Sequence, residues 1–303
     1  MPELPEVETM RRGIARVLGL RIGAVAFPRG RCRPISVQPS TQALIKGMTG
    51  GEFSAVHRFG KRVALELASA TAHERMYLVI EPRMTGLLLV APPPTQEHVR
   101  LEIAFSDPIS PPLIFWDRRG LGTLRLLDAA GLDAACGPRR LGPDGLVIGP
   151  ADLRSRLGRS RRAIKVALLD QQAVAGIGNI YAAEILFRVG IDPRTPCDRL
   201  KGDSWEAIAT TSRELLATAV EMEGSTIGDE TYRTADNRPG RFQLLHQVYG
   251  REGSPCGACG GGIVRIVQAQ RATFYCPACQ PRQPGRRRKA RSSGGAPGRK
   301  TVG

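Results

Sequence analysis

The sequence predicts a multidomain α+β protein: an N-terminal helix with an antiparallel β-sandwich, a helical domain, and a C-terminal β-hairpin module with four cysteines. Three observations predict this fold class. Apolar residues recur at helical spacing over 5–18, short β-rich runs follow between 21 and 127, and helical spacing returns from 151 to about 224. A chain of 303 residues is long enough for two ordinary domains and a small third module.

The N-terminal helix is predicted over residues 5–18. Pro5 suits the first helical position, and the acidic residues after it suit the positive end of the helix dipole. Pro2 and Glu3 therefore lie just before a helix N-terminus. The apolar face of this helix consists of Val7, Met10, Ile14, Val17 and Leu18.

The next region is rich in β-forming residues, and Gly and Pro interrupt it, most clearly at 91–94. Several short strands at this spacing are typical of a sandwich or barrel. We therefore expect a β-sandwich domain over 2–127, followed by a linker over 128–150 that is rich in Gly, Pro and Asp. The predicted strands are 21–27, 52–58, 62–67, 77–80, 87–90, 99–105, 113–117 and 124–127.

Residues 151–245 are predicted to form a helical domain that ends in a polar, mobile loop over 225–240. Between the first two helices lies the turn Gly176-Ile177-Gly178-Asn179, which could present N–H groups and Asn179 to a DNA phosphate. Taken alone, this turn is more often a plain interhelical connection. The expected helices are 160–175 with Ser160 as cap, about 180–189, and a third from a Ser204 cap to near 224.

Four of the seven cysteines form two Cys-x-x-Cys pairs, within a module that we expect over 246–280. Two such pairs bring four thiolates to one tetrahedral Zn²⁺, and the alternation from Ile263 to Tyr275 predicts a β-hairpin between them. Redox pairs or disulfides are the alternative, but the odd cysteine count and the lack of a signal peptide favour a structural zinc site. The expected ligands are Cys256, Cys259, Cys276 and Cys279.

The net charge of +16 indicates a nucleic-acid partner. Residues 281–303 carry eight basic side chains and no acidic one, so residues 1–280 still carry +8. The tail is expected to be a disordered basic arm. No apolar run approaches the ~20 residues that span a bilayer, so we expect no membrane association. The odd cysteine count and the lack of a signal peptide favour the reducing cytoplasm as the location.

The N-terminus has the composition of a catalytic amine site. Removal of Met1 before the small residue Pro2 would free a secondary amine, and a nearby helix N-terminus should lower the pKa of that amine. A neutral amine can attack a sugar C1′ and form an iminium ion. Glu3 could then protonate the sugar ring oxygen, and Glu6 could orient water or relay protons. The alternative is an ordinary chain terminus whose glutamates balance the helix dipole.

These segments resemble bacterial formamidopyrimidine-DNA glycosylase, the enzyme that removes 8-oxoguanine and ring-opened purines. The resemblance spans about 2–280 and implies a β-sandwich with an N-terminal helix, a helix–two-turn–helix domain and a zinc finger. Separate motifs in the same order are far more specific than any one of them. The motifs are Pro2-Glu3-Leu4-Pro5-Glu6-Val7-Glu8, Gly176-Ile177-Gly178-Asn179-Ile180-Tyr181-Ala182-Ala183-Glu184, Gln247-Val248-Tyr249-Gly250-Arg251 and Gln270-Arg271-Ala272-Thr273-Phe274-Tyr275-Cys276.

The resemblance assigns catalytic roles to four residues. It implies that Pro2 is the Schiff-base nucleophile, Glu3 the general acid and Lys61 the lysine of β-elimination, and that Arg271 grips the phosphate beside the lesion. It also implies DNA-binding roles for six further residues. These are His98, Arg119, which faces the orphaned cytosine, Met84 and Leu121, which fill the gap in the duplex, and Lys165 and Asn179, which lie near the lesion and its phosphate.

Three departures from the family pattern concern the choice of damaged base. Leu121 replaces the phenylalanine wedge, Glu81 stands where the family has a histidine, and the loop 225–240, which covers the flipped lesion in the family, is atypical. A leucine can still part a base step, but it stacks less well. The nucleophile is unaffected, so these changes leave lesion preference open.

The resemblance and the residues together predict a bifunctional DNA glycosylase and abasic-site lyase that acts on oxidised purines. The expected partner is damaged double-stranded DNA, bound by a monomer with one structural Zn²⁺ and no nucleotide cofactor, at the bacterial nucleoid. An endonuclease VIII-like enzyme acting on oxidised pyrimidines is the nearest alternative. A zinc-ribbon DNA-binding protein without catalysis is the other.

The basic tail gives a first prediction. If residues 281–303 contact DNA, their removal should flatten the dependence of log affinity on log salt, because each phosphate contact contributes a slope of about 0.9. Duplex binding of the full and truncated chains, measured by fluorescence anisotropy across salt concentrations, checks this. Equal slopes would mean that the tail does not touch phosphate.

Overall fold

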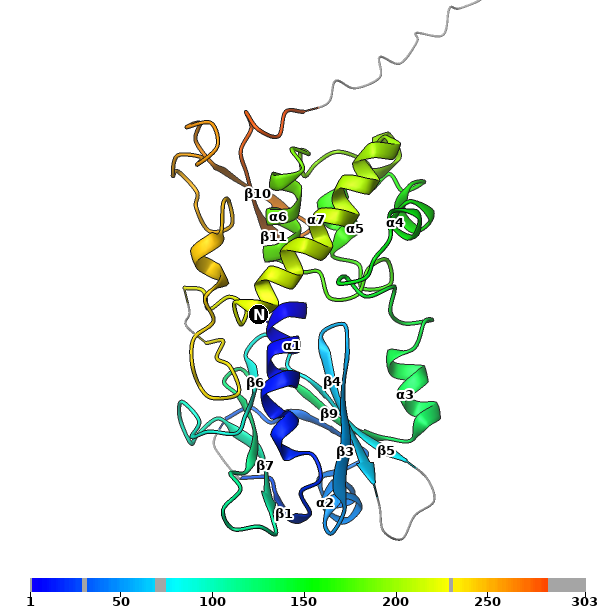
Figure 1. The fold of residues 1–303 in the computed structure, drawn as a ribbon, viewed down its shortest axis with the longest axis vertical. Helices are drawn as coiled ribbons and strands as arrows, with labels where there is room; N and C mark the ends of the chain where they lie inside the picture. Colours follow the sequence, from blue (N-terminus) through cyan, green and yellow to red (C-terminus); the bar gives the residue numbers. More distant parts are fainter. Residues whose placement is uncertain (1, 29–31, 69–74, 229–230, 283–303) are drawn as a thin grey trace, which may run out of the picture.

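The computed structural model describes residues 2–28, 32–68, 75–228 and 231–282. Two bodies form the molecule, a pair of β-sheets and a group of helices, and helix α1 (Leu4–Gly13) begins beside the helices and runs between the sheets (Figure 1). No helix among the described residues is long and apolar enough to cross a membrane. The expected removal of Met1 and most of the expected basic tail, from 283 onward, lie outside the described residues.

The β region forms two packed sheets, as predicted. The orders are β2-β9-β5-β4-β3 and β1-β7-β8-β6, with every neighbouring pair antiparallel except β2 and β9. All eight predicted runs form strands. The strands are β1 (Ile22–Ala26), β2 (Ser36–Gln38), β3 (Glu52–Phe59), β4 (Arg62–Ala68), β5 (Met76–Glu81), β6 (Gly86–Leu89), β7 (Val99–Phe105), β8 (Leu113–Asp117) and β9 (Thr123–Leu127).

Helix α1 belongs to two hydrophobic cores. Its side chains Val7 and Met10 are fully buried with apolar residues of both sheets, such as Phe53 and Phe115. Leu4, one turn earlier, is fully buried in the separate core of the helical domain. A short 3₁₀ turn (Ile14–Val17) completes the predicted helix. The first turn of α1 is therefore fixed at the junction of the two domains.

Two elements of the N-terminal domain were not predicted. Strand β2 has only three residues and pairs in parallel with the distant β9, so local alternation could not reveal it. Helix α2 (Thr41–Met48) had a readable signal, because the Ser40 hydroxyl accepts a hydrogen bond from the N–H of Ala43 as an N-cap. The expected linker 128–150 also contains a helix, α3 (Ala129–Cys136), which Asp128 caps through the N–H of Gly131.

The helical domain differs from the prediction before residue 179. The predicted helix over 160–175 is wrong, because α5 (Ile164–Leu168) has five residues and Ser160 does not cap it. The chain turns after α5, where the Gln171 amide accepts the N–H of Gly176 and donates to the carbonyl of Ile177. The other helices are α4 (Pro150–Leu157), which was not delimited, α6 (Asn179–Arg188), as predicted, and α7 (Gly202–Glu221), which begins before Ser204.

The cysteine module contains the predicted hairpin, β10 (Val264–Gln268) and β11 (Arg271–Tyr275), which are antiparallel. The two turn residues between them have left-handed backbone conformations, as a tight two-residue hairpin requires. The chain leading into the module, after the 3₁₀ turn η3 (Phe242–Leu245), is anchored to α6. The buried carboxylate of Glu184 accepts the N–H groups of residues 247, 248 and 249 at 2.8–3.0 Å.

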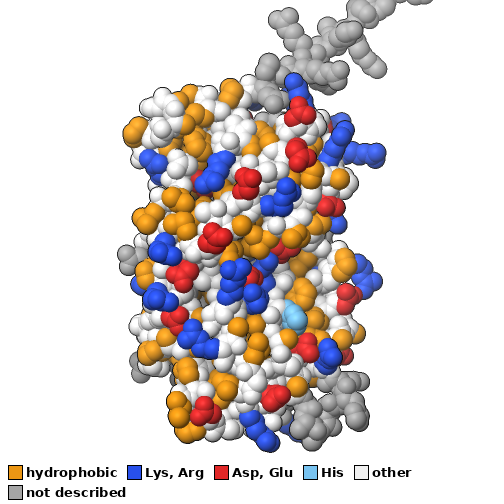
Figure 2. All heavy atoms as spheres, in the orientation of Figure 1, with side chains coloured by type: hydrophobic (Ala, Val, Ile, Leu, Met, Phe, Trp, Pro, Cys, Tyr) orange, Lys and Arg blue, Asp and Glu red, His pale blue; other side chains and the backbone are white. Residues whose placement is uncertain are grey.

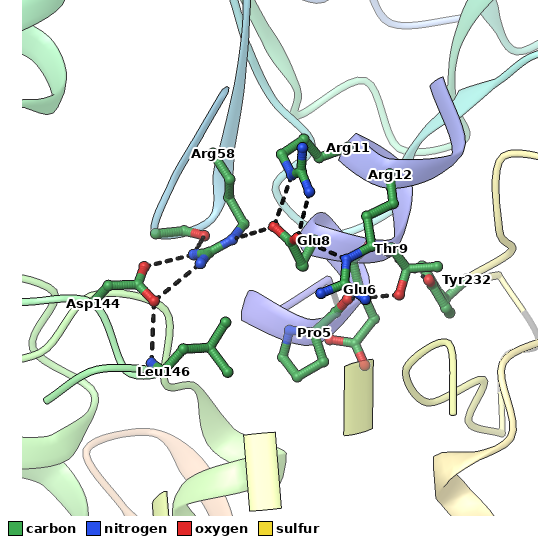
Figure 3. A network of polar contacts seen from close by, with 11 residues as sticks. Pro5, Glu6, Glu8, Thr9, Arg11, Arg12, Arg58, Asp144, Leu146 and Tyr232 are labelled. Atoms are coloured by element: carbon green, nitrogen blue, oxygen red, sulfur yellow. Dashed lines mark hydrogen bonds and ion pairs between the residues drawn. The ribbon is translucent and has the colours of Figure 1, made fainter. Parts of the chain in front are cut away.

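An ion-pair network joins the two domains behind α1 (Figure 3). The Arg58 guanidinium, whose side chain is 9% exposed, donates to Glu8 on α1 at 3.0 Å and to both carboxylate oxygens of Asp144 at 2.6 and 3.0 Å. It also donates to the carbonyl of Gly60 at 3.1 Å. One side chain thus connects α1, the β3–β4 turn and the segment before α4.

This network makes stability depend on pH. Burial alone would raise the pKa of Glu8, but hydrogen bonds from Arg11, Arg12 and Arg58 outweigh burial and lower it from 4.5 to about 2. A depressed carboxyl pKa contributes stability that is present above pH 4.5 and is lost as the pH falls toward 2. We expect Glu8 to contribute about 3 kcal/mol at neutral pH. Urea unfolding should therefore show a difference between wild type and Glu8→Gln that shrinks on acidification.

The control is Glu214→Gln, because Glu214 is an exposed glutamate on α7. This variant should differ little from wild type at any pH. A Glu8→Gln difference that stays constant from pH 7 to pH 2 would contradict the assignment.

Candidate active site

The two residues before α1, Pro2 and Glu3, lie where α1 meets α6. Pro2 is buried and Glu3 is 1% exposed. The Glu3 carboxylate accepts the N–H groups of Ile180 at 3.0 Å and Tyr181 at 3.4 Å, so it occupies the positive end of the α6 dipole. The N–H groups of Ile180 and Tyr181, directly after the turn 176–179, are therefore occupied by Glu3.

Two glycines of the turn before α6 make this approach possible. A Cβ atom on Gly178 would lie 2.3 Å from Cδ of Glu3. A Cβ atom on Gly176, which has φ +100°, would lie 2.4 Å from Cδ1 of Leu4. The N–H of Leu4 also donates to the carbonyl of Gly176 at 3.0 Å. Glycine at these two positions therefore leaves the space that the side chains of Glu3 and Leu4 occupy.

Glu6 is the second buried carboxylate of the site. Its Oε2 accepts the N–H of Glu3 at 2.8 Å, while Oε1 accepts the Tyr181 hydroxyl at 2.6 Å and the N–H of Ser225 at 2.7 Å. Burial raises the pKa of Glu6, and the charge of Glu3 raises it further. Burial and Glu6 also raise the pKa of Tyr181 well above its usual value. Glu6 is therefore suited to hold or release a proton beside Pro2.

Two lysines share the electrostatic surroundings of Glu3. Lys61 follows Gly60 in the β3–β4 turn, and burial lowers the pKa of its amine, an effect that Glu3 opposes and Arg271 strengthens. Burial also lowers the pKa of Lys165 to about 8, again with Glu3 opposing and Arg271 adding to it. Glu3 and Arg271, the predicted general acid and phosphate ligand, thus influence both predicted lysines.

The zinc-finger hairpin reaches this site through the start of β11. The carbonyl of Ala272 accepts hydrogen bonds from the Asn179 amide at 2.9 Å and the Lys165 amine at 3.3 Å, and Lys165 also contacts the Asn179 oxygen. Arg271, one residue earlier, has an exposed side chain. The contacts at Ala272 therefore place Arg271 beside Asn179 and Lys165.

The four cysteine sulfurs all lie within 4.8 Å of one another. The pairs Cys256–Cys279 and Cys259–Cys276 are separated by 3.8 and 3.5 Å. A tetrahedral Zn²⁺ with Zn–S bonds of 2.3 Å requires sulfur separations of about 3.8 Å. The four thiols therefore fit one structural zinc ion, and with four ligands the ion has no open position for water.

The three residues expected to fill the duplex lie on two adjacent turns. Met84 lies between β5 and β6, and Arg119 and Leu121 lie between β8 and β9. The fully buried carboxylate of Asp117 accepts the Thr85 hydroxyl at 2.5 Å and the N–H of Arg119 at 3.2 Å. Asp117 and Thr85 therefore hold the two turns together.

His98 lies near these turns, because its carbonyl accepts the N–H of Asp117 at 2.9 Å. Its imidazole contacts the Cys32 thiol at 3.4 Å and the Glu97 carboxylate at 3.0 Å. On the face shown in Figure 2, Lys and Arg side chains are interspersed with Asp and Glu side chains, so this face has no continuous basic stripe.

The loop 225–240, without its undescribed residues 229–230, packs against the N-terminal domain. Tyr232 and Ala235 are almost fully buried in the sandwich core. The Ala235 carbonyl accepts the N–H of Val90 at 2.9 Å, and Asp236 forms an ion pair with Arg16 at 2.9 Å. The expected mobile loop is therefore folded onto the sheets, and it begins at Ser225 beside Glu6.

Sequence reasoning did not single out four residues that organise the site. These are Tyr181 and Ser225, which bind Glu6, and Asp117 and Thr85, which join the two turns. Tyr181 stands within a motif that the sequence displays, so a signal existed for it. Ser225 follows the helix-ending Gly224 without any distinctive pattern.

Three family models match the chain. Residues 1–124 match the formamidopyrimidine-DNA glycosylase N-terminal domain, and residues 141–231 match the H2TH domain of the same enzyme. Residues 253–282 match a zinc finger found in FPG and IleRS, in agreement with the four clustered thiols, and the module binds one structural Zn²⁺. The fold and the site thus define a DNA glycosylase with a helix–two-turn–helix domain and a zinc finger.

Named relatives show which family of DNA glycosylases the chain belongs to. The formamidopyrimidine-DNA glycosylase of Chloroflexus aggregans is 40% identical over 287 residues, which cover 92% of this chain and 98% of the relative. The chain belongs to the formamidopyrimidine-DNA glycosylase family.

Solved structures agree with this assignment. The MutM (Fpg) protein of Thermus thermophilus has a TM-score of 0.80 at 36% identity, over 93% of this chain and 100% of that one. A Lactococcus lactis Fpg mutant bound to Fapy-dG-containing DNA has a TM-score of 0.81 at 31% identity, with the same shares covered.

The close approach of Glu3 to Gly178 gives a prediction. In Gly178→Ala the new methyl group must displace the Glu3 carboxylate, and a shift of about 1 Å in a catalytic group costs on the order of 100-fold in rate. We therefore expect excision of a damaged base to slow by about 100-fold, while zinc content stays at one ion per chain. Gly202→Ala is the matched control, because a Cβ at Gly202 meets nothing within 4 Å. A wild-type rate in Gly178→Ala would disprove the claim that Gly178 is required to position the Glu3 carboxylate.

Proposed function

We propose that this chain is a bifunctional DNA glycosylase and abasic-site lyase that excises oxidised purines from double-stranded DNA, with the amine of Pro2 as nucleophile. The observation that carries the proposal is the burial of Pro2 and Glu3 at the N-terminus of α6, with Glu6 beside them. Solved relatives include complexes with Fapy-dG DNA and with carbocyclic 8-oxo-G DNA. We place the enzyme in the bacterial cytoplasm, at the nucleoid, acting as a monomer.

The first chemical step is displacement of the base. The lone pair of the neutral Pro2 nitrogen forms a bond to C1′ of the flipped nucleotide, and the base leaves with the electron pair of the glycosidic bond. The base takes up the proton that the Pro2 nitrogen loses, so the nitrogen lone pair is free to form the C=N bond of the next step. Glu3 assists by protonating the sugar ring oxygen, whose bond to C1′ then breaks to give an iminium ion. The Glu3 carboxylate left behind is stabilised by the α6 N–H groups.

The iminium ion then allows strand cleavage. It acidifies the C2′ proton, and loss of that proton expels the 3′ phosphate by β-elimination, after which δ-elimination expels the 5′ phosphate. Lys61, whose pKa burial lowers, is the proposed lysine for β-elimination. Arg271, Lys165 and Asn179 form one cluster through Ala272, and we assign them to the phosphate and sugar beside the lesion.

The duplex is held open by a separate group of residues. We propose that Met84 and Leu121 occupy the gap left by the flipped nucleotide, that Arg119 faces the orphaned base, and that His98 contacts the backbone. The Asp117–Thr85 hydrogen bond keeps the two turns in register for this role. We also propose that the loop 225–240 covers the lesion, a role supported by the hydrogen bond of its first residue, Ser225, to Glu6 at 2.7 Å.

The chemistry gives a direct test. Incubation with an 8-oxoguanine·cytosine duplex and borohydride should reduce the iminium ion and leave a covalent protein–DNA adduct, seen as a shifted band on a denaturing gel. Pro2→Gly should lose most of the adduct, because a primary amine replaces the cyclic secondary amine and its fixed position. Absence of any adduct with wild type, or undiminished trapping by Pro2→Gly, would contradict the mechanism.

The same assay separates the alternatives. An endonuclease VIII-like enzyme would release thymine glycol faster than 8-oxoguanine from matched duplexes. A zinc-ribbon protein without catalysis would bind duplex with full affinity and form no adduct on either substrate.

A further inference from the structure

A buried histidine in the C-terminal half of the chain lies outside the roles assigned above. His246 follows the 3₁₀ turn η3 and is 8% exposed. Its Nε2 lies 3.1 Å from the hydroxyl oxygen of Ser225. This contact connects the entry to the zinc-finger module with the start of the loop 225–240.

Ser225 connects His246 to the catalytic carboxylate. The N–H of Ser225 donates to Oε1 of Glu6 at 2.7 Å, and its hydroxyl lies 3.4 Å from the hydroxyl of Tyr181. Tyr181 donates to the same Oε1 at 2.6 Å. The N–H of Ser225 and the hydroxyl of Tyr181 therefore both donate to Oε1 of Glu6. The hydroxyl of Ser225 lies between His246 and Tyr181.

Glu6 continues this connection to the nucleophile. Its other oxygen accepts the N–H of Glu3 at 2.8 Å, and Glu3 is bonded directly to Pro2. Glu3, Glu6, Tyr181 and Ser225 are each at most 3% exposed, so water does not compete strongly for these hydrogen bonds. A shift of Ser225 would therefore be transmitted to the backbone beside the amine.

Aromatic side chains hold the imidazole in place. Its ring packs edge-on against Phe242 at 5.7 Å and against Tyr249 at 5.8 Å. Tyr249 in turn packs against Phe274 of β11 at 5.2 Å, so the orientation of His246 depends on the zinc-finger hairpin. Burial also lowers the pKa of His246 to about 4, which keeps the ring neutral near pH 7.

We propose that His246 is a positioning residue for the catalytic N-terminus, which acts by fixing Ser225 and, through Ser225, the carboxylate of Glu6. This inference rests on the proposed function. It predicts an effect on the rate of base excision from bound DNA and little effect on duplex affinity, because His246 acts on buried groups and not on phosphate contacts.

A matched pair of substitutions tests the contact. In His246→Gln the terminal amide occupies the place of Nε2 and can still reach Ser225, whereas in His246→Asn the amide ends at the place of Nδ1 and cannot. Both variants are polar, neutral and smaller than histidine, so they should lose similar stability. Under single-turnover conditions with an 8-oxoguanine·cytosine duplex, we expect His246→Asn to be about tenfold slower than wild type and His246→Gln to recover most of the rate.

A double-mutant cycle asks whether the effect passes through Ser225. If it does, His246→Asn combined with Ser225→Ala should be no slower than Ser225→Ala alone. His57→Asn is the control, because His57 is an exposed histidine on β3, and its rate should match wild type. His246→Gln and His246→Asn should melt at closely similar temperatures, and all variants should bind a duplex with a stable abasic analogue with closely similar affinity.

Three results would overturn the inference. These are equal rates for the Gln and Asn variants, a wild-type rate for His246→Asn, or multiplicative losses in the double variant. Failure of the proposed function looks different, because the wild-type protein would then form no borohydride adduct at all. A wild-type adduct with no difference between Gln and Asn rejects the positioning role alone.

Discussion

The contact between the Glu3 carboxylate and the N-terminus of α6 is the constraint on which the site depends. It joins the first turn of the sandwich domain's helix to the first turn of a helix in the other domain, over a separation of 177 residues. The glycine turn before α6 exists in this form because any side chain at Gly178 would displace the carboxylate. The position of the proposed nucleophile Pro2, the packing of the two domains and the sequence of that turn thus have one common cause.

The same device recurs elsewhere in the molecule. Buried carboxylates of Glu3, Glu6, Asp117 and Glu184 each accept main-chain N–H groups from a distant or irregular segment. A carboxylate has only acceptors, and a buried N–H without a partner costs roughly 1–3 kcal/mol, so each contact specifies one backbone arrangement strongly. Buried carboxylates thereby fix the conformation of connecting segments that hydrogen bonds within sheets and helices do not fix.

The sequence predicts the parts of this protein whose causes are local. Strand alternation, the helix of Asn179–Arg188 and the cysteine hairpin all follow from periodicity and spacing. The prediction of a helix over 160–175 was wrong, because the Gln171 amide stabilises turns that no local sequence pattern indicates. In the site, the resemblance pointed to Glu3, Lys61 and Arg271. The contact of Ser225 with Glu6 could not be predicted, because Ser225 lies 219 residues away and becomes its neighbour only through the tertiary fold.

The position of Leu4 in the helical core has a consequence for the life of the chain in the cell. Glu3 and Glu6 are synthesised before the backbone groups that bind them, because Ile180 of α6 follows Glu3 by 177 residues and Ser225 follows Glu6 by 219. Domains generally fold in the order of their synthesis, so the sheets can form while the N-terminus still lacks its partners. The first turn of α1 is therefore synthesised early and reaches its final position late. A chain that still lacks α6 therefore lacks the N–H groups that hold the Glu3 carboxylate, so the site is completed only when the helical domain has been made.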